Sequence, residues 1–419
     1  MNFYKILAIC IFFLASLPIA AQKSIPVINA VSKMVDITDG EHYKKGVWQI
    51  LPERNPDFYY VSFPKKPHKV TFHTDIDSIS FNTSYGNSYD FYIVLKNGDS
   101  CLTRIMAIEK ELLKFHRSSK TIGSKSDTIP IKIGENSKIH FTGSINSSEP
   151  LNFQFDLGSG GCGINENSID KVKFFFDDKT FLINSKGRNE VATSSKNTLN
   201  VGSLTWDNNI TFIESNNLEK GEDGILGNSL FMDKVIEIDY DKEIMIIHDS
   251  LPEYSENYVK QSYILDGVIP HIKGDIISGV DKFTDWFMFD TGYAGILKIS
   301  QGFSEKFELP NKSEKTFNPF DDILILEGLT IGEHKFSNVS THVYSKVGGT
   351  SGAIIGNKIL KYFNVIIDNR NGFIYFKKNG LIKKEHSVFS LLLYVLLSAV
   401  IIALVFVFLR FKKWKGLKL

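Results

Sequence analysis

The chain of 419 residues repeats two short blocks in the same order. Residues 155–161 (FDLGSGG) return 134 positions later as residues 289–295 (FDTGYAG), and residues 224–228 (GILGN) return 129 positions later as residues 353–357 (AIIGN). Apolar runs typical of β-strands precede the first block and follow the second block in both copies. Two blocks that repeat in one order indicate a duplicated β domain rather than a chance match.

Each copy of the first block places an Asp directly after an apolar strand and a Gly two positions later. The strand end holds the carboxylate in a fixed, partly desolvated place, and Gly permits a sharp turn behind it. If a twofold axis relates the copies, Asp156 and Asp290 face each other. Facing carboxylates do not both ionise readily, so they share one proton; one serves as a base towards water and the other as an acid. The pair predicts hydrolysis of a peptide bond with no metal, no cofactor and no covalent intermediate.

With these blocks the chain resembles the pepsin- and retropepsin-like aspartic proteases, in the two-lobed form that carries both half-sites in one chain. Residues 290–292 (DTG) match the D-T-G of that family, and residues 156–159 (DLGS) match its D-T-G-S except at Leu157. Residues 223–227 (DGILG) and 352–356 (GAIIG) look like the second signature of the family, which lies beside the catalytic loops.

The resemblance covers about residues 127–378. It implies an all-β, two-lobed pepsin-like acid protease fold, with duplicated β-barrel-like lobes at residues 127–250 and 260–378, and a peptide or protein substrate. The site residues that it implies are catalytic Asp156 and Asp290, the supporting loop residues Leu157, Gly158, Ser159, Thr291, Gly292 and Tyr293, and the second-signature residues Gly224, Ile225, Leu226, Gly227, Ile354, Ile355 and Gly356.

Three departures from the family pattern leave other functions open. Leu157 lacks the hydroxyl with which the family ties its two halves together. Between Phe174 and Leu204, where a pepsin-type flap would carry a tyrosine, the sequence has none. Tyr293 replaces a small residue and is expected to narrow the cleft. The alternatives are a protease-like fold without activity that binds peptides or cell-envelope partners, and an envelope structural protein in which the Asp residues only cap turns.

Apolar segments at the two ends predict the compartment. Residues 1–21 read as a secretory signal peptide. Residues 388–409 form 22 residues without a charge, long enough to cross a bilayer, and the basic residues 410–419 follow. We therefore expect an exported body, periplasmic or extracellular, held by one C-terminal transmembrane helix with a cytoplasmic tail.

The remaining segment, residues 25–118, is expected to form a small N-terminal β domain with a short helix at residues 106–115 (MAIEKELLKF). A polar linker at residues 117–127 suggests a boundary near Ser118. The net charge of +1 gives no electrostatic case for a nucleic-acid partner. Three cysteines exclude a disulfide scaffold, and whether Cys101 pairs with Cys162 stays open, as does the oligomeric state.

Overall fold

The computed structural model describes residues 24–108, 112–118, 123–184, 187–312, 314–316, 322–344 and 352–381. The predicted signal peptide, transmembrane helix and basic tail lie outside these ranges. None of the helices in the described part of the chain has the length and apolar character needed to cross a membrane.

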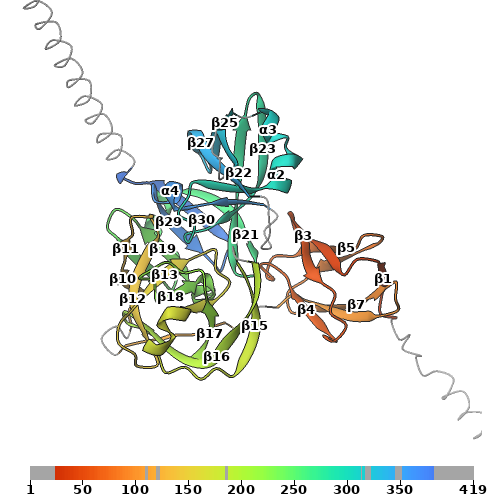
Figure 1. Cartoon of the computed structure of the whole chain (residues 1–419), viewed down its shortest axis with the longest axis horizontal. Helices are drawn as coiled ribbons and strands as arrows, with labels where there is room; N and C mark the ends of the chain where they lie inside the picture. The colour runs from red at the N-terminus through yellow and green to blue at the C-terminus, as the bar shows by residue number, and fades with distance from the viewer. Residues whose placement is uncertain are drawn as a thin grey trace, which may run out of the picture. The chain divides into compact units, whose positions relative to one another are not determined.

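The described residues are almost entirely strands and loops, which confirms the predicted all-β class. They fall into two compact units. The first unit comprises the described residues of Met1–Val61 and Pro67–Ile108, and the second comprises those of Ser62–Lys66 and Glu109–Leu419. Figure 1 draws the first unit in red and orange and most of the second in yellow to blue.

The boundary between the units lies at Ile108, ten residues before the predicted position near Ser118. Leu113 and Phe115 pack against the hydrophobic core of the second unit. Arg117 lies in β9 (His116–Arg117), which pairs with β17, and its Nε donates to Asp127 Oδ2 over 2.6 Å. A segment that appears polar in sequence is therefore part of the second unit.

The short helix predicted at residues 106–115 does not appear in its described part. Met106 is the last residue of β8, and residues 112–115 have no regular secondary structure. The apolar spacing does not by itself require a helix, because Leu113 and Phe115 pack on the core without regular secondary structure.

The first unit consists of two four-stranded sheets, ordered β1-β7-β8-β4 and β3-β2-β5-β6. Phe72 of one sheet and Phe91 of the other meet with ring centroids 4.9 Å apart, and both are fully buried. The two sheets therefore enclose one core. The strands are β1 (Val27–Ala30), β2 (Met34–Asp39), β3 (His42–Gln49), β4 (Asp57–Tyr60), β5 (His68–His73), β6 (Ser78–Thr83), β7 (Ser88–Leu95) and β8 (Ser100–Met106).

The second unit contains two lobes, seen in Figure 1 as a yellow-green body and a teal body with blue β29 and β30 between them. Lobe 1 runs from β10 to β20: β10 (Ser126–Pro130), β11 (Lys132–Ile133), β12 (Ile139–Ile145), β13 (Leu151–Asp156), β14 (Cys162–Asn165), η1 (Glu166–Lys171), β15 (Asp178–Asn184), β16 (Gly187–Val201), β17 (Leu204–Ser215), β18 (Gly224–Gly227), η2 (Asn228–Phe231), β19 (Val235–Asp239) and β20 (Ile244–His248). After η3 (Glu253–Asn257), lobe 2 runs from β21 to β30: β21 (Val259–Asp266), β22 (Ile269–Ser278), β23 (Asp281–Phe289), β24 (Leu297–Ser300), α2 (Gln301–Lys306), α3 (Leu309–Lys312), β25 (Glu314–Thr316), β26 (Asp322–Ile331), β27 (His334–Tyr344), β28 (Ala353–Ile355), α4 (Asn357–Leu360), β29 (Phe363–Asp368) and β30 (Phe373–Lys378).

The strand pairings of lobe 1 recur in lobe 2. In lobe 1, β12 pairs with β13, β13 runs parallel to β18, β14 runs parallel to β17, and β12 also pairs with β16. In lobe 2, β22, β23, β28, β24, β27 and β26 make the same set of pairings. The extra β12–β16 and β22–β26 pairings curl each sheet back on itself. The duplication that the repeated blocks predict is therefore present in the described strands.

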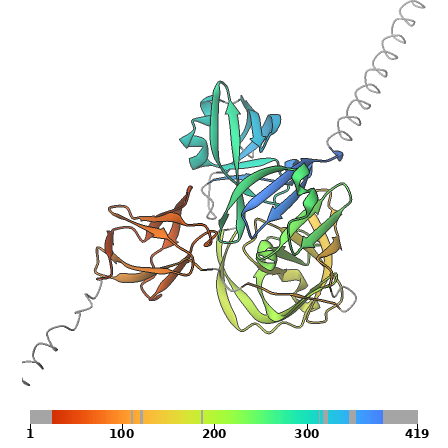
Figure 2. The same ribbon diagram turned by 180° about the vertical axis from the view of Figure 1, so that it is seen from behind.

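The two lobes are joined by the antiparallel pairing of β19 with β29. Figure 2 shows the blue strands of this region from behind. Ile236 pairs with Ile367, and Ile238 pairs with Val365. Moving each residue by the 129-position repeat exchanges these two pairs, and Glu237 lies directly opposite Ile366, its own counterpart. A local twofold axis therefore passes through this pairing and relates the lobes.

Candidate active site

Both aspartates lie where a buried strand ends beside a second-signature strand. Asp156 is the last residue of β13 and pairs with Gly227 of β18. Asp290 directly follows β23, and its N–H donates to Ile355 O of β28 over 3.0 Å. The parallel neighbours β18 and β28 thus carry the second signature and hold each aspartate in the same way. The two blocks that the sequence repeats are in contact within each lobe.

The last glycines of the second signature allow the chain to cross close to the aspartate loops. A Cβ added to Gly227 would lie 2.5 Å from Ser159 O, and one added to Gly356 would lie 2.5 Å from Tyr293 O. Real Cβ atoms do not approach a backbone oxygen so closely. Close approach is therefore the physical reason for glycine at both positions.

The glycines of the D-x-G loops bring the two carboxyl groups together. A Cβ on Gly158 would lie within 3.0 Å of three atoms of the Asp290 carboxyl group, and a Cβ on Gly292 would do the same at Asp156. Each aspartate thus rests over the glycine of the opposite loop. The arrangement is reciprocal, as the twofold axis requires.

The two carboxyl groups are hydrogen-bonded to each other, but their other contacts differ. Asp156 Oδ1 accepts the N–H of Gly158 over 2.7 Å. Asp290 Oδ1 accepts two N–H groups, from Gly292 over 2.8 Å and from Tyr293 over 2.9 Å. Asp290 therefore has the environment that better stabilises an anion.

Burial and then the charge of Asp290 raise the pKa of Asp156 well above its usual range. Burial also raises the pKa of Asp290, but the hydrogen bond from Asp156 and the two backbone N–H groups oppose that rise. Counted over the whole residue, backbone included, both aspartates are only partly buried. We assign the shared proton to Asp156 and the negative charge to Asp290.

One hydroxyl connects the two loops. Thr291 Oγ1 donates to Phe155 O over 3.0 Å and accepts the N–H of Leu157 over 2.9 Å, and Thr291 is fully buried. The side chain of Leu157 is fully buried in the hydrophobic core instead. Thr291 therefore makes both of its hydrogen bonds to the opposite loop. Leu157, in the corresponding position, contributes apolar packing in place of a second hydroxyl.

Two asparagines follow the second signature, one in each lobe, and that of lobe 2 bonds to an aspartate loop. Asn357 Nδ2 donates to Thr291 O over 2.6 Å, and Tyr240 Oη donates to Asn357 Oδ1 over 2.9 Å. Its counterpart Asn228 donates to Val268 O over 2.9 Å. Both asparagines are fully buried. The available signal was that Asn closes the repeated block in both copies.

The other predicted loop residues contact their own lobe. Ser159 Oγ donates to Gly161 O over 3.0 Å. The ring of Tyr293 lies against Gly295 and Gly356, where added Cβ atoms would come within 3.0 Å of it. Lys298 Nζ lies 6.0 Å from the centroid of the same ring. The predicted narrowing of the cleft by Tyr293 stays a prediction.

The hairpin of β15 and β16 occupies the place in the strand order where a flap was expected. Its described residues contain no tyrosine, and its aromatic residue is Phe181, which is 55% exposed. Cys101 and Cys162 are buried free thiols, one in each unit.

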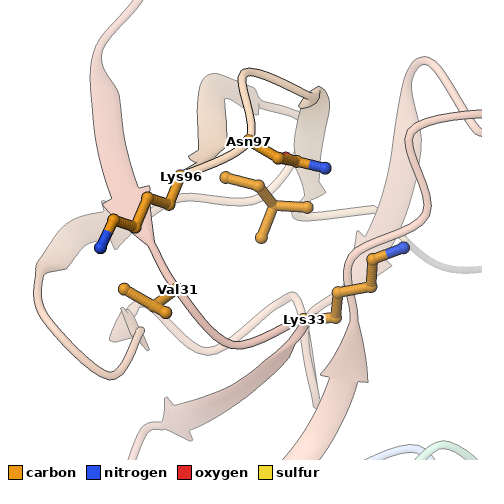
Figure 3. Close-up of a pocket in the computed structure, with 5 residues that line it drawn as sticks. Val31, Lys33, Lys96 and Asn97 are labelled. Atoms are coloured by element: carbon orange, nitrogen blue, oxygen red, sulfur yellow. The ribbon is translucent and has the colours of Figure 1, made fainter.

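A surface hollow of about 400 Å³ belongs to the first unit and includes none of the predicted site residues. Val31, Lys33, Leu95, Lys96 and Asn97 line it. Figure 3 shows the side chains of Lys33 and Lys96 pointing away from each other at its edge. None of these lining residues carries a carboxyl group.

Comparison with known proteins finds likenesses among solved structures alone. No protein family and no curated protein matches the sequence. Among solved structures, the crystal structure of aspartic proteinase from Irpex lacteus superposes with a TM-score of 0.44 at 14% sequence identity, covering 61% of this chain and 98% of that one. A likeness this distant assigns no function.

Proposed function

We propose that the second unit is an aspartic-type peptidase, in which Asp156 and Asp290 activate a water molecule to hydrolyse a peptide bond of a peptide or protein substrate. The supporting observation is the pair of hydrogen-bonded carboxyl groups, one on each lobe and each resting over the glycine of the opposite loop. Paired carboxyls with unequal surroundings supply one acid and one base at the same pH.

The unequal contacts set the roles. Asp290, as the carboxylate, takes a proton from the water while the water oxygen bonds to the carbonyl carbon, and Asp156 gives its proton to the carbonyl oxygen. The resulting gem-diol then collapses. Asp156 takes a proton from a diol hydroxyl, Asp290 gives its proton to the leaving nitrogen, and the C–N bond breaks. Both carboxyls return to their starting protonation states.

Asp156→Asn and Asp290→Asn test this mechanism. Asn keeps the shape but serves as neither acid nor base, so each variant should lose at least about a thousandfold in kcat, and the double variant should be hardly slower. Cleavage of an unfolded protein at mildly acidic pH, with and without pepstatin, gives the measurement. Asp207→Asn, at a 63% exposed side chain of lobe 1, is the matched control. Undiminished cleavage by Asp290→Asn would end the proposal.

A second candidate is a peptide-binding module without activity. It is favoured by Leu157, which supplies no second hydroxyl, and by the absence of tyrosine from the described part of the β15–β16 hairpin. A wild-type protein that binds peptides but cleaves none under the conditions above would favour this candidate.

We also propose that the body is exported and held in the membrane by residues 388–409, on the strength of the two apolar end segments. Protease added to intact spheroplasts should then remove the body and leave a small basic fragment in the membrane. A body that is digested only after lysis contradicts this topology.

A further inference from the structure

A buried lysine lies beside the strand that ends in Asp156. Lys138 precedes β12 and is only 7% exposed. Its Nζ lies 2.7 Å from Glu219 Oε1, 3.3 Å from Glu222 Oε1 and 3.2 Å from Gln154 Oε1. A buried ammonium group is costly unless it is paired, and the mechanism above does not use this one.

Gln154 contacts this lysine and stands on the same strand as Asp156. Gln154 stands two residues before Asp156 on β13, so the two side chains share one face of the strand, about 7 Å apart. The backbone register pairs Gln154 with His140 of β12. The positive charge therefore lies one side chain away from Asp156.

The negative partner of the lysine is also buried. Glu222 is 4% exposed, and its Oε1 lies 2.9 Å from His140 Nε2. Burial alone would raise the pKa of Glu222, but the hydrogen bonds from His140 and from the N–H of Glu219, together with the charge of Lys138, lower it. Glu222 is thus held as an anion against Lys138.

Lobe 2 differs at the corresponding place. The register that pairs His140 with Gln154 in lobe 1 pairs His271 with Met288 in lobe 2. Met288 stands two residues before Asp290, just as Gln154 stands before Asp156, but it is apolar and 6% exposed. The polar neighbourhood is therefore specific to the Asp156 side of the pair.

We propose that Lys138 is a positioning residue. Its buried positive charge shifts the pH range in which the Asp156–Asp290 pair carries a single negative charge to lower values. This inference rests on the proposed function, because it assigns the protonation range in which the pair acts. The charge of Lys138 lowers the pKa of both aspartates, which agrees with its place in the fold.

The other charged groups at this site set the sign of each test. His140, Glu219 and Glu222 contact Lys138 or its partners, and Asn136 donates to Glu219. Removing the ammonium group should raise both pKa values of the pair, so both limbs of the pH–rate profile move to higher pH. Removing the charge of Glu222 leaves Lys138 less compensated, so both limbs should move to lower pH.

The experiment compares Lys138→Met, Lys138→Arg and Glu222→Gln in the full-length protein. We expect shifts of about 0.5–1 pH unit in opposite directions for Lys138→Met and Glu222→Gln, and no shift for Lys138→Arg, which keeps the charge. Damage to the fold would lower the rate without moving the limbs in opposite directions. Unmoved limbs, or shifts of the same sign in both variants, overturn the inference; if Lys138→Met does not fold, the downward shift of Glu222→Gln decides.

A second readout separates this inference from the proposed function. NMR titration of ¹³C-labelled aspartate carboxyls follows the pair directly and needs no cleavage. Opposite shifts in this titration support the role of Lys138 even if the wild type cleaves nothing. Normal cleavage with unshifted titrations leaves the peptidase standing and removes the role of Lys138.

Discussion

At the scale of single residues, the site depends on how closely Gly292 approaches Asp156. Any Cβ at Gly292 would lie within 3.0 Å of the Asp156 carboxyl group, whereas a Cβ at Gly160, in the first aspartate loop, meets nothing within 4 Å. Gly292→Ala should therefore displace Asp156 and lower kcat by about a hundredfold or more, since such displacements are costly to catalysis. Gly160→Ala should stay within about threefold of wild type.

The measurement for this pair of variants is the rate of cleavage beside a thermal unfolding curve. Gly160→Ala controls for the general effect of adding a methyl group to an aspartate loop. Equal rates for the two variants would mean that the contact between Gly292 and Asp156 does not govern the pair.

The sequence predicts both aspartates and their glycines as site residues, because these residues recur in a fixed pattern, and the fold brings the four together. The lack of a hydroxyl at Leu157 leaves the loop contact to Thr291, but the sequence could not show which backbone groups of Phe155 and Leu157 it bonds. Nor could it select Lys138, whose importance comes from burial and from Glu222, a residue 84 positions away that only the fold brings near. Effects of this kind depend on tertiary contacts and leave no local pattern.

At the scale of elements, the repeated blocks predict strands in matching order, and the β13–β18 and β23–β28 pairings agree with that order. The sequence did not show how the lobes are joined, because the pairing of β19 with β29 lies between strands with no pattern specific to a junction. The ten residues between the end of the first unit and the predicted boundary near Ser118 have a similar cause. Leu113 and Phe115 gain their apolar contacts only when the lobe folds, so the local sequence does not reveal them.

At the scale of the whole molecule, the carboxyl pair makes the free energy of unfolding decrease as the pH rises. The pKa of Asp156 is raised in the folded protein. The folded state therefore holds this proton more tightly than the unfolded chain, and the contribution to the free energy of unfolding is complete below the unfolded pKa and is lost as the pH rises through the folded one. The stabilising contribution of Asp156 therefore begins to fall near pH 4 and decreases further as the pH rises.

Asp156→Asn carries no proton to lose, so its advantage over wild type should grow from acidic to neutral pH. We expect the melting temperature of the variant to exceed that of wild type by at least about 3 °C at pH 7 and to match it near pH 3. Thermal unfolding measured across this range provides the check. A constant difference at all pH values would contradict the linkage.

Asp223→Asn provides the comparison of opposite sign. Hydrogen bonds from the Asn152 N–H, Lys171 and Ser168 outweigh burial and lower the pKa of Asp223. Its contribution to stability is present above the unfolded pKa and is lost as the pH falls. Asp223→Asn should therefore destabilise the protein at neutral pH and have a smaller effect under acid conditions.

The register of β19 against β29 has a consequence for self-association. Glu237 and Ile366 occupy the same position in the two copies and lie opposite each other on the twofold axis. A homodimer of lobe 1 formed through the same strand would set one buried Glu237 against another, and like charges directly opposite in a sheet repel. A homodimer of lobe 2 would set Ile366 against Ile366 without this penalty. The charge of Glu237 thus disfavours pairing between two copies of lobe 1. It favours the pairing of lobe 1 with lobe 2 within a single chain.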